Sequence, residues 1–315
     1  MNANHIQLPW GKESLTADLP RGWRLGDVLE PVALPGAPNS LDEAQRALAE
    51  PVGMPRLRQL ARSGIKIALV IDDDSRPTPV ASLFPAVAAE LQAGGASLQQ
   101  ATLVPALGVH RGMSADEVAR RLGEDWLSKI AWHNPGGDDP EEMVFIGATS
   151  RGTPVWVDKT VAEADLIVSI GCIEPHIIAS FGGGYKNLIP GVAGRATIAH
   201  NHALNCCPDT FNMVGQPIER NPMHLDLEEA GGMILGKVFI INAVLNSQLQ
   251  VVRVVCGDPL QAHRAGTEIS AGIYGVQVPK LADVVITDSN PMNSTCVRAS
   301  RRLPTPSARC ARAAP

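Results

Sequence analysis

Residues 66–95 read KIALVIDDDSRPTPVASLFPAVAAELQAGG, and this stretch decides the fold class. The apolar run at its start predicts a buried strand. A polar turn follows at residues 72–79, and either Pro77 or Pro79 suits the start of a helix. The apolar segment after it predicts a long helix that ends at Gly94 and Gly95. The sequence therefore predicts a strand–turn–helix unit of the kind that builds parallel sheets.

The same pattern recurs along the chain. Residues 101–123 predict a strand, a loop and a helix that Ser114 caps, with Glu117 three residues later. Alternating strands and helices argue for an α/β fold with a mainly parallel sheet. The other expected elements are a hairpin at 6–20 around a Gly-Lys turn, a helix at 41–51, strands at 164–176, 237–246, 249–258 and 282–291, and a helix at 263–275.

Composition excludes several classes of protein. The chain has 315 residues, of which 45% are hydrophobic and 19% charged, as in globular proteins with a real core. A net charge of −5 gives no reason to expect nucleic acid or an anionic membrane as a partner. No apolar run approaches the roughly 20 residues of a membrane span, and the start lacks the apolar segment of a signal peptide. Six cysteines without a C-x-x-C pair indicate reduced thiols, so we expect a cytoplasmic protein.

Three polar loops follow apolar strands, at residues 72–79, 108–111 and 174–186. In open α/β sheets, ligands bind beyond the carboxyl ends of the strands. We therefore expect these three loops to meet at one site.

The first loop, DDDSRPTP, offers three candidate groups. Arg76 can clamp a carboxylate, and Asp73 can accept hydrogen bonds from hydroxyl groups. Thr78 can donate to a phosphate or cap the following helix. The plain alternative is an ordinary solvated turn before a capped helix.

Two histidines follow the other strands. His110 and His176 are candidates for proton transfer, because imidazole titrates near neutral pH. Lys186 comes just after a glycine triplet at 182–184 and can be either a nucleophile or an ordinary surface lysine. The loop is not a P-loop, because Asn187 stands where that motif requires Ser or Thr.

His200 and His202 are two residues apart, a spacing that is poor for two ligands on one helical face. A single histidine is unusual as the sole protein ligand of a metal such as zinc. A metal here would need most of its ligands from a group other than the protein. His133, His224 and His263 have weaker contexts and receive no role.

The combination of motifs resembles the nickel-dependent lactate racemase family. The motifs are D-D-x-S-R-P-T-P (72–79), G-V-H-R (108–111), I-E-P-H (173–176), F-G-G-G-Y-K-N-L-I-P-G (181–191) and T-I-x-x-N-H (197–202). Each motif alone is weak, whereas the ordered set is specific. The resemblance covers roughly residues 5–293 and implies a racemase or epimerase of a 2-hydroxy acid, with a nickel-pincer nucleotide as cofactor.

The resemblance also implies roles for individual residues. Lys186 would attach the cofactor covalently, and His200 would be the protein ligand of the nickel. His110 and His176 would be the two catalytic histidines, and Arg76 would hold the substrate.

Further residues are expected at the cofactor. Asp73 and Thr78 would contact the cofactor or order their loop, and Gly183 and Gly184 would lie against it. The implied partners are a small 2-hydroxy acid and the enzymes that make the cofactor. Gly182 departs from many relatives, which have Ser there.

Three segments are expected along the chain. They are a catalytic and cofactor-binding domain at 1–258, the beginning of an incomplete second α/β domain at 259–293, and an out-of-frame, disordered tail at 294–315. The tail is rich in Arg, Ser and Pro and has no apolar periodicity. One shifted-frame back-translation produces a family-like continuation, so we predict a frameshift near codon 293 and impaired activity.

Two other functions stay open. One is a non-catalytic binder of the nickel cofactor. The other is a 2-hydroxy acid dehydrogenase, which is disfavoured because no strand–G-x-G-x-x-G–helix unit is present.

Overall fold

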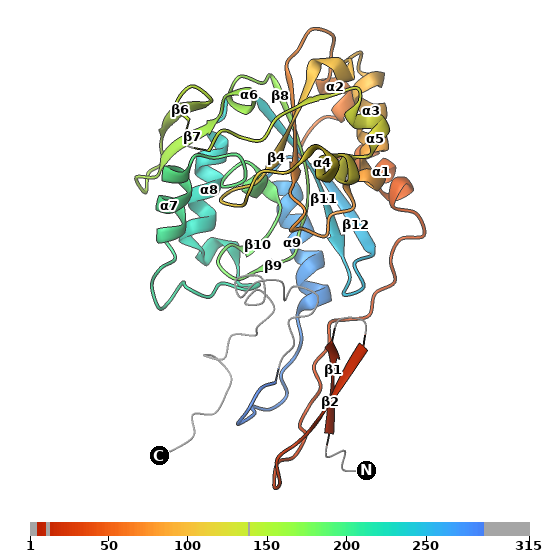
Figure 1. Cartoon of the computed structure of the whole chain (residues 1–315), viewed down its shortest axis with the longest axis vertical. Coiled ribbons are helices and arrows are strands. Elements are labelled where there is room, and N and C mark those ends of the chain that lie inside the picture. The colour runs from red at the N-terminus through yellow and green to blue at the C-terminus, as the bar shows by residue number, and fades with distance from the viewer. Residues whose placement is uncertain (1–4, 11–12, 138, 287–315) are drawn as a thin grey trace. The chain divides into compact units, whose positions relative to one another are not determined.

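The computed structural model describes residues 5–10, 13–137 and 139–286 (Figure 1). By their contacts, these residues form two compact units: Val32–Tyr274, and the described parts of Met1–Pro31 and Gly275–Pro315. In the second unit, β1 (His5–Trp10) pairs with β2 (Glu13–Asp18) as an antiparallel hairpin. The hairpin predicted at 6–20 is confirmed, although its turn at residues 11–12 lies outside the described residues.

The large unit is built on a six-stranded sheet with the order β12-β11-β8-β3-β4-β5. All neighbouring strands in it are parallel except β11 and β12, which form an antiparallel pair. The predicted α/β fold with a mainly parallel sheet is therefore confirmed. The strands are β3 (Ile67–Asp72), β4 (Ala101–Ala106), β5 (Ala131–Trp132), β8 (Leu166–Cys172), β11 (Lys237–Leu245) and β12 (Val251–Gly257).

The strand order creates a switch point between β3 and β8. From β3 the chain adds β4 and β5 on one side, and it then returns to place β8, β11 and β12 on the other. At such a point the two connecting loops leave the sheet in opposite directions, so a crevice opens beyond the carboxyl ends of the strands. Two of the three polar loops expected at a site follow β3 and β8.

Strand β3 is buried along its whole length, because helices cover both faces of the sheet (Figure 1). Ile67, Leu69 and Ile71 face a core shared with helices α1 and α3. Ala68 and Val70 face a second core, shared with α7 and α8. This explains why the strand reads as a continuous apolar run rather than an alternating one.

The remaining elements connect or cover the strands. Their bounds are α1 (Ser40–Ala49), α2 (Leu57–Leu60), α3 (Val80–Ala93), α4 (Ala115–Leu122), α5 (Glu124–Leu127), α6 (Lys159–Ala162), α7 (Arg195–Ala203), α8 (Pro222–Gly232) and α9 (Gln261–Tyr274); η1 (Leu98–Gln100), η2 (Gly184–Asn187) and η3 (Ile218–Arg220); β6 (Met143–Ala148), β7 (Pro154–Asp158), β9 (Pro175–His176) and β10 (Ser180–Phe181).

The helix boundaries follow the signals in the sequence. Helix α3 begins directly after Pro79 and ends before Gly94. Helix α4 has the predicted capping box, in which Ser114 and Glu117 satisfy each other's backbone N–H groups. None of the helices in the described ranges is long and apolar enough to cross a membrane.

One predicted strand is wrong in the part that can be checked. Residues 283–286 of the expected strand 282–291 form no strand, and residues 287–291 lie outside the described ranges. Val284, Val285 and Ile286 are about half exposed. A strand forms only where a neighbour accepts its backbone hydrogen bonds, and no strand in the described residues pairs with this segment.

The expected division of the chain stays a prediction. Helix α9, just beyond the expected boundary at 258, packs on β11 and β12 within the large unit. The tail predicted at 294–315 lies outside the described residues.

Candidate active site at the switch point

Asp73 and His110 form a hydrogen-bonded pair beyond β3 and β4. Oδ2 of Asp73 lies 2.5 Å from Nδ1 of His110, and its Oδ1 accepts from the hydroxyl and the backbone N–H of Ser75. Burial by itself raises the pKa of Asp73, but the hydrogen bonds from His110 and Ser75 outweigh it and lower the pKa to about 2. Asp73 is therefore a carboxylate at neutral pH. It keeps a proton on Nδ1 of His110 and leaves Nε2 of the neutral ring as a base.

In His176 the Nδ1 atom accepts hydrogen bonds, whereas in His110 it donates one. His176 lies just past β8, in β9, and is 5% exposed. Its Nδ1 accepts hydrogen bonds from the backbone N–H groups of Ala179 (3.1 Å) and Ile178 (3.4 Å). A neutral ring in this position must carry its proton on Nε2. The two neutral histidines thus have opposite tautomers: His110 presents a basic ring nitrogen, and His176 presents an N–H group that donates a hydrogen bond.

Arg76 and Glu174 join the two strands of the switch point. Nη1 of Arg76 lies 2.6 Å from Oε1 of Glu174, and both side chains are largely buried. Burial lowers the pKa of Arg76, but Glu174, together with other anionic neighbours, raises it further, so the guanidinium stays charged. The carbonyl oxygen of Arg76 accepts from Nη1 of Arg121 on α4 (2.9 Å), which fixes the backbone of the loop.

Thr78 is engaged inside the same loop. Its hydroxyl donates to Oδ2 of Asp72, and the other carboxylate oxygen of Asp72 pairs with Arg121. Thr78 is 2% exposed, so these contacts give it a role in ordering the loop. Its expected contact with a cofactor stays a prediction. Sequence reasoning missed Arg121, because nothing in its helical context shows that it reaches back to β3.

The glycine loop needs its glycines for packing. Gly183 and Gly184 have φ angles of +82° and +60°, which favour glycine. A Cβ atom on Gly183 would lie 2.8 Å from Oδ1 of Asn242, and one on Gly184 would lie 2.9 Å from the ring of His263. The N–H of Gly184 donates to that same Asn242 oxygen (2.9 Å). Their expected contact with a cofactor stays a prediction, but both glycines are required to seat the loop that carries Lys186.

His202, rather than His200, is the α7 histidine whose pKa responds to Lys186. Burial in the first place, and the charge of Lys186 in the second, lower the pKa of His202 to about 4. Among the described residues, its buried Nδ1 has no hydrogen-bond partner. Nδ1 of His200 instead lies 2.9 Å from the hydroxyl of Thr153. Both histidines lie on helix α7, where a spacing of two residues points them in different directions.

A buried carboxylate anchors α7. Asp226 on α8 is fully buried and accepts hydrogen bonds from the side chains of Thr149 (2.5 Å), Thr153 (2.7 Å) and Asn201 (2.8 Å). Because the hydroxyl proton of Thr153 is donated to Asp226, Thr153 accepts from His200. This network sets the rotation of α7 and thereby the direction of its histidines. In the sequence, only Thr149 and Thr153 beside Gly152 mark this network. Threonines next to a glycine turn are too common to predict a buried carboxylate partner.

The structure thus places Asp73 against His110 and Arg76 against Glu174, and it brings Lys186 near enough to His202 for its charge to lower the pKa of that ring. His176 follows Glu174 by two residues and belongs to the same edge of the sheet.

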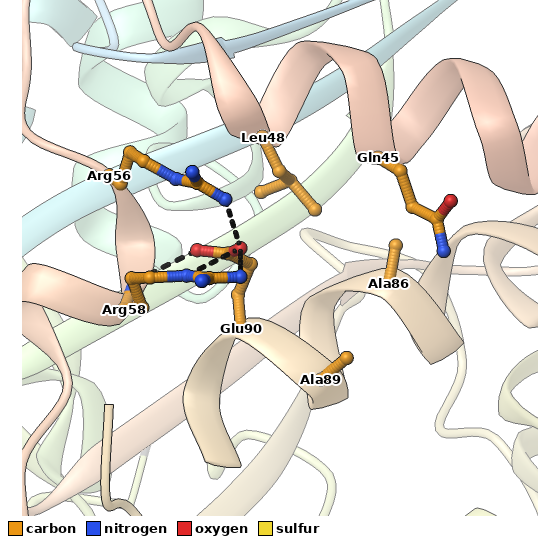
Figure 2. Close-up of a pocket in the computed structure, with 7 residues that line it drawn as sticks. All are labelled: Gln45, Leu48, Arg56, Arg58, Ala86, Ala89 and Glu90. Carbon is orange, nitrogen blue, oxygen red and sulfur yellow. Dashed lines mark hydrogen bonds and ion pairs between the residues drawn. The ribbon is translucent and has the colours of Figure 1, made fainter. Parts of the chain in front are cut away.

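A cavity of about 230 Å³ lies elsewhere, among α1, α2 and α3 (Figure 2). Glu90 enters it from α3 and accepts from Arg56 (2.8 Å) and Arg58 (2.9 Å). None of the predicted site residues lines it. Arg56 and Arg58 both pair with Glu90 there, and the cavity lies away from the predicted site residues, so it does not compete with the switch point as a candidate site.

Fold and site together define an open α/β protein whose switch point holds paired groups for acid–base chemistry and a cation for an anionic ligand. Comparison with known proteins gives the family. Residues 10–212 match the model of the lactate racemase N-terminal domain, and the chain belongs to this family.

Two curated relatives are lactate racemases. The one from Thermoanaerobacterium thermosaccharolyticum is 32% identical over 287 residues, which cover 90% of this chain and 66% of the relative. The one from Lactiplantibacillus plantarum is 31% identical over 268 residues, covering 84% and 62%. The chain therefore spans less than two thirds of the length of either relative.

Solved structures give the same fold. The lactate racemase apoprotein from Thermoanaerobacterium thermosaccharolyticum superposes with a TM-score of 0.82 at 30% identity, over 93% of this chain and 69% of that one. A Thermotoga maritima protein superposes with a TM-score of 0.60 at 21% identity, over 79% and 63%, and supports the fold alone.

Proposed function

We propose that this chain is the part of a 2-hydroxy acid racemase or epimerase that binds the cofactor and transfers protons. The observation that supports it most directly is the pair of histidines held in opposite tautomers at the switch point. Membership of a family named for lactate racemase gives the proposal its substrate class. Lactate or a close analogue is the first substrate to test.

The proposed cofactor is a nickel-pincer nucleotide bound covalently to Lys186. When bound, it would supply reversible acceptance of the hydride from C2 of the substrate. The residues present fit such a group. A nickel ion that receives most of its donors from the nucleotide needs one neutral imidazole, and His202 has a lowered pKa and an unpartnered buried ring nitrogen close to Lys186.

Support for the nickel ligand is better for His202 than for His200. Nδ1 of His200 donates to Thr153, which ties that ring to the Asp226 network. Among the described residues, Nδ1 of His202 makes no hydrogen bond, although the backbone of Ile198 acts on the ring and raises its pKa. Lys186 is the charged neighbour of this ring. We therefore transfer the ligand role from His200 to His202.

The two histidines perform the proton transfers. Nε2 of His110 takes the hydroxyl proton of one enantiomer, and Asp73 stabilises the imidazolium that results. His176 delivers a proton to the oxygen on the opposite face from its imidazolium form, in which Nδ1 also carries a proton and gives up the hydrogen bonds from Ala179 and Ile178. For the reverse reaction the roles exchange, so His176 begins as the neutral base and His110 begins as the imidazolium. Between turnovers each histidine exchanges its proton with solvent.

Arg76 would hold the substrate carboxylate. A guanidinium binds a carboxylate through two parallel hydrogen bonds, which fixes the direction of the C2 atom. In the structure Glu174 provides the carboxylate instead. The substrate must therefore displace Glu174 or share Arg76 with it.

The proposal includes the partners and location expected from the sequence: a small 2-hydroxy acid, the enzymes that make the cofactor, and a cytoplasmic setting. A test co-expresses the full chain with those enzymes and nickel and supplies one enantiomer of lactate. Formation of the other enantiomer supports the racemase. Net release of the 2-keto acid would instead support the dehydrogenase, and a bound cofactor without turnover would support the binder.

A further inference from the structure

Two histidines without a role in the proposed reaction, His224 and His263, are completely buried beside the glycine loop. His224 lies on α8 and is 1% exposed, and His263 lies on α9 and is 0% exposed. Their rings stack, with centroids 5.3 Å apart and planes at 12°. Burying two imidazoles is costly unless their nitrogens find partners, so the contacts of those nitrogens show what the pair does.

Both rings bind backbone carbonyls of the same loop. Nδ1 of His224 lies 2.7 Å from the carbonyl oxygen of Ala179, and Nε2 of His263 lies 2.8 Å from that of Gly182. A carbonyl can only accept, so each of these ring nitrogens carries a proton and donates. The neighbouring carbonyl of Ile178 likewise accepts from an amide side chain, that of Asn205 (2.7 Å).

The loop depends on such donors because its backbone is irregular. The β9–β10 pairing covers only two residue pairs, at 175–176 and 180–181, so few carbonyls of residues 177–184 have a partner in a strand ladder. A buried carbonyl without a partner costs about 1–3 kcal/mol. Backbone N–H groups of Met213 and Gly215 bind the carbonyls of Ile177 and Ser180. The carbonyl of Ala179 accepts from the N–H of Phe181 and from His224 on α8, and that of Gly182 accepts from His263 on α9.

The ring of His263 also packs directly against the backbone of Gly184 in the loop. Gly184 packs so closely on it that a Cβ atom would lie 2.9 Å from the ring. One residue later, Tyr185 packs on Gly231 of α8, where a Cβ atom would lie 2.3 Å from the Tyr185 ring. The segment that leads into Lys186 is thus fitted against α8 and α9.

Glu228 holds the histidine pair from the other side. It lies 3.3 Å from Nε2 of His224 and accepts two hydrogen bonds from Arg264, at 2.6 and 3.0 Å. Burial raises the pKa of Glu228, but His224 and Arg264 outweigh it and lower the pKa to about 2. The carboxylate therefore stays charged and ties α8 to α9 near neutral pH.

A metal ion would be another explanation for His224, Glu228 and His263, whose potential ligand atoms lie within 4.8 Å of one another. The geometry argues against it. An imidazole binds a metal in the plane of its ring, and two stacked rings with planes at 12° do not share a point in both planes near their nitrogens. Arg264 moreover brings a positive charge and occupies both oxygens of Glu228.

We propose that His224 and His263 are positioning residues, which hold the glycine loop and hence Lys186 through their hydrogen bonds to the carbonyls of Ala179 and Gly182. The pair acts on the backbone and touches neither substrate nor cofactor. This inference deepens the proposed function, because the loop matters for catalysis only if Lys186 carries the cofactor. The arrangement of the loop itself can be tested without any cofactor.

His224 binds its carbonyl through Nδ1, and His263 binds its carbonyl through Nε2. Substitution of each histidine by Asn and by Gln can therefore separate the hydrogen bond from the size of the side chain. The amide nitrogen of Gln reaches the place of Nε2, and that of Asn reaches the place of Nδ1. His263→Gln should therefore keep the bond to Gly182, whereas His263→Asn should lose it. At His224 the order reverses: His224→Asn should keep the bond to Ala179, and His224→Gln should lose it.

The measurement is hydrogen–deuterium exchange of the full-length chain, without cofactor, followed by peptides that cover residues 177–187. Loss of one hydrogen bond should speed exchange of this loop about 5- to 10-fold. Peptides from β3 and β8 report global stability and should not change. The expected result is faster loop exchange in His263→Asn and His224→Gln and near wild-type exchange in His263→Gln and His224→Asn.

Three results would overturn the proposal. Equal effects of Asn and Gln at both positions would mean that the rings only fill space. Loop exchange that rises together with exchange of β3 and β8 would mean a general loss of stability. Stoichiometric Ni²⁺ or Zn²⁺ in a Lys186→Ala, His202→Ala chain, lost on substitution of His263, would mean a metal site. The His224 pair decides the question if a His263 variant does not fold.

Discussion

Two pairs of histidines in this molecule show how the position of an imidazole in the fold decides its hydrogen-bond partners. His110 and His176 lie at the carboxyl edge of the sheet, and the protein binds Nδ1 of each, once by a carboxylate and once by backbone N–H groups. His224 and His263 lie behind the glycine loop and bind carbonyl oxygens. We call the first the edge pair and the second the buried pair. We propose the edge pair for proton transfer and the buried pair for holding the backbone of the glycine loop.

The difference lies in charge as well as in place. Burial, followed by the charge of His224, lowers the pKa of His263 to about 3, so its ring is neutral throughout the physiological range. His110 is instead 36% exposed in its side chain and has the anionic Asp73 as its partner. A histidine that must gain and lose a proton needs such a partner, whereas one that holds a carbonyl needs a fixed tautomer.

The largest expected effect is on turnover, from the edge pair. Replacing His110 with Ala should lower the rate of racemisation about 10²- to 10⁴-fold, because a general base is lost. Chiral chromatography of the product from cofactor-loaded protein measures it. The exposed His5 of the hairpin serves as the control, and His5→Ala should leave the rate unchanged. A His110→Ala variant with more than a tenth of the wild-type rate would break the assignment.

The buried pair should show its effect in stability. His263→Ala removes a fully buried ring and leaves the carbonyl of Gly182 unpaired, so the free energy of unfolding should fall by about 2–4 kcal/mol. His110→Ala should cost less, about 1–2 kcal/mol, because Asp73 loses one hydrogen bond and keeps those from Ser75. Urea titrations of both variants compare them directly. Equal losses would remove the distinction between the pairs.

The stability of the folded chain should depend on pH through the ionisation of Asp73. Its pKa is about 2 in the folded chain, against 3.8 for the free group, so the folded state favours the carboxylate. This contribution, about 2 kcal/mol, is fully present above pH 4 and is lost as the pH falls towards 2. The stability difference between wild type and Asp73→Asn should therefore shrink between pH 5 and pH 2. A difference that is constant with pH would contradict the depressed pKa.

The smallest effect is expected at Arg76. Glu174→Gln removes the carboxylate that occupies the guanidinium, so a substrate carboxylate should bind more easily. We expect the KM for the hydroxy acid to fall about 2- to 5-fold with little change in kcat, since a largely buried ion pair keeps little net free energy after its desolvation cost. Steady-state kinetics with the loaded protein decide it. A higher KM would show that Glu174 orients Arg76 rather than competing for it.

The sequence was sufficient for the sheet and for one edge of the site. Apolar runs ended by polar loops predicted β3, β4 and β8, and the switch-point rule brought Asp73, His110 and His176 to the same edge. The helix α3 and its limits followed from Pro79 and Gly94. These features are local, and each has a signal within a few residues.

The remaining features depend on long-range contacts. The side chains of Asn242 and His263 bind the glycine loop from about 60 and 80 residues away, and no local pattern announces them. The choice between His200 and His202 likewise depends on Asp226, which fixes the rotation of α7 from another helix. The spacing of two residues indicated that only one of these histidines would be a metal ligand, but it did not indicate which one.

The central claim is that Lys186 and His202 together hold the cofactor at the switch point. The most direct test is a peptide map of the full chain after co-expression with the cofactor-making enzymes and nickel. We expect a covalent adduct on Lys186. Nickel should be retained in His200→Ala and lost in His202→Ala. An unmodified Lys186, or nickel lost only in His200→Ala, would contradict it.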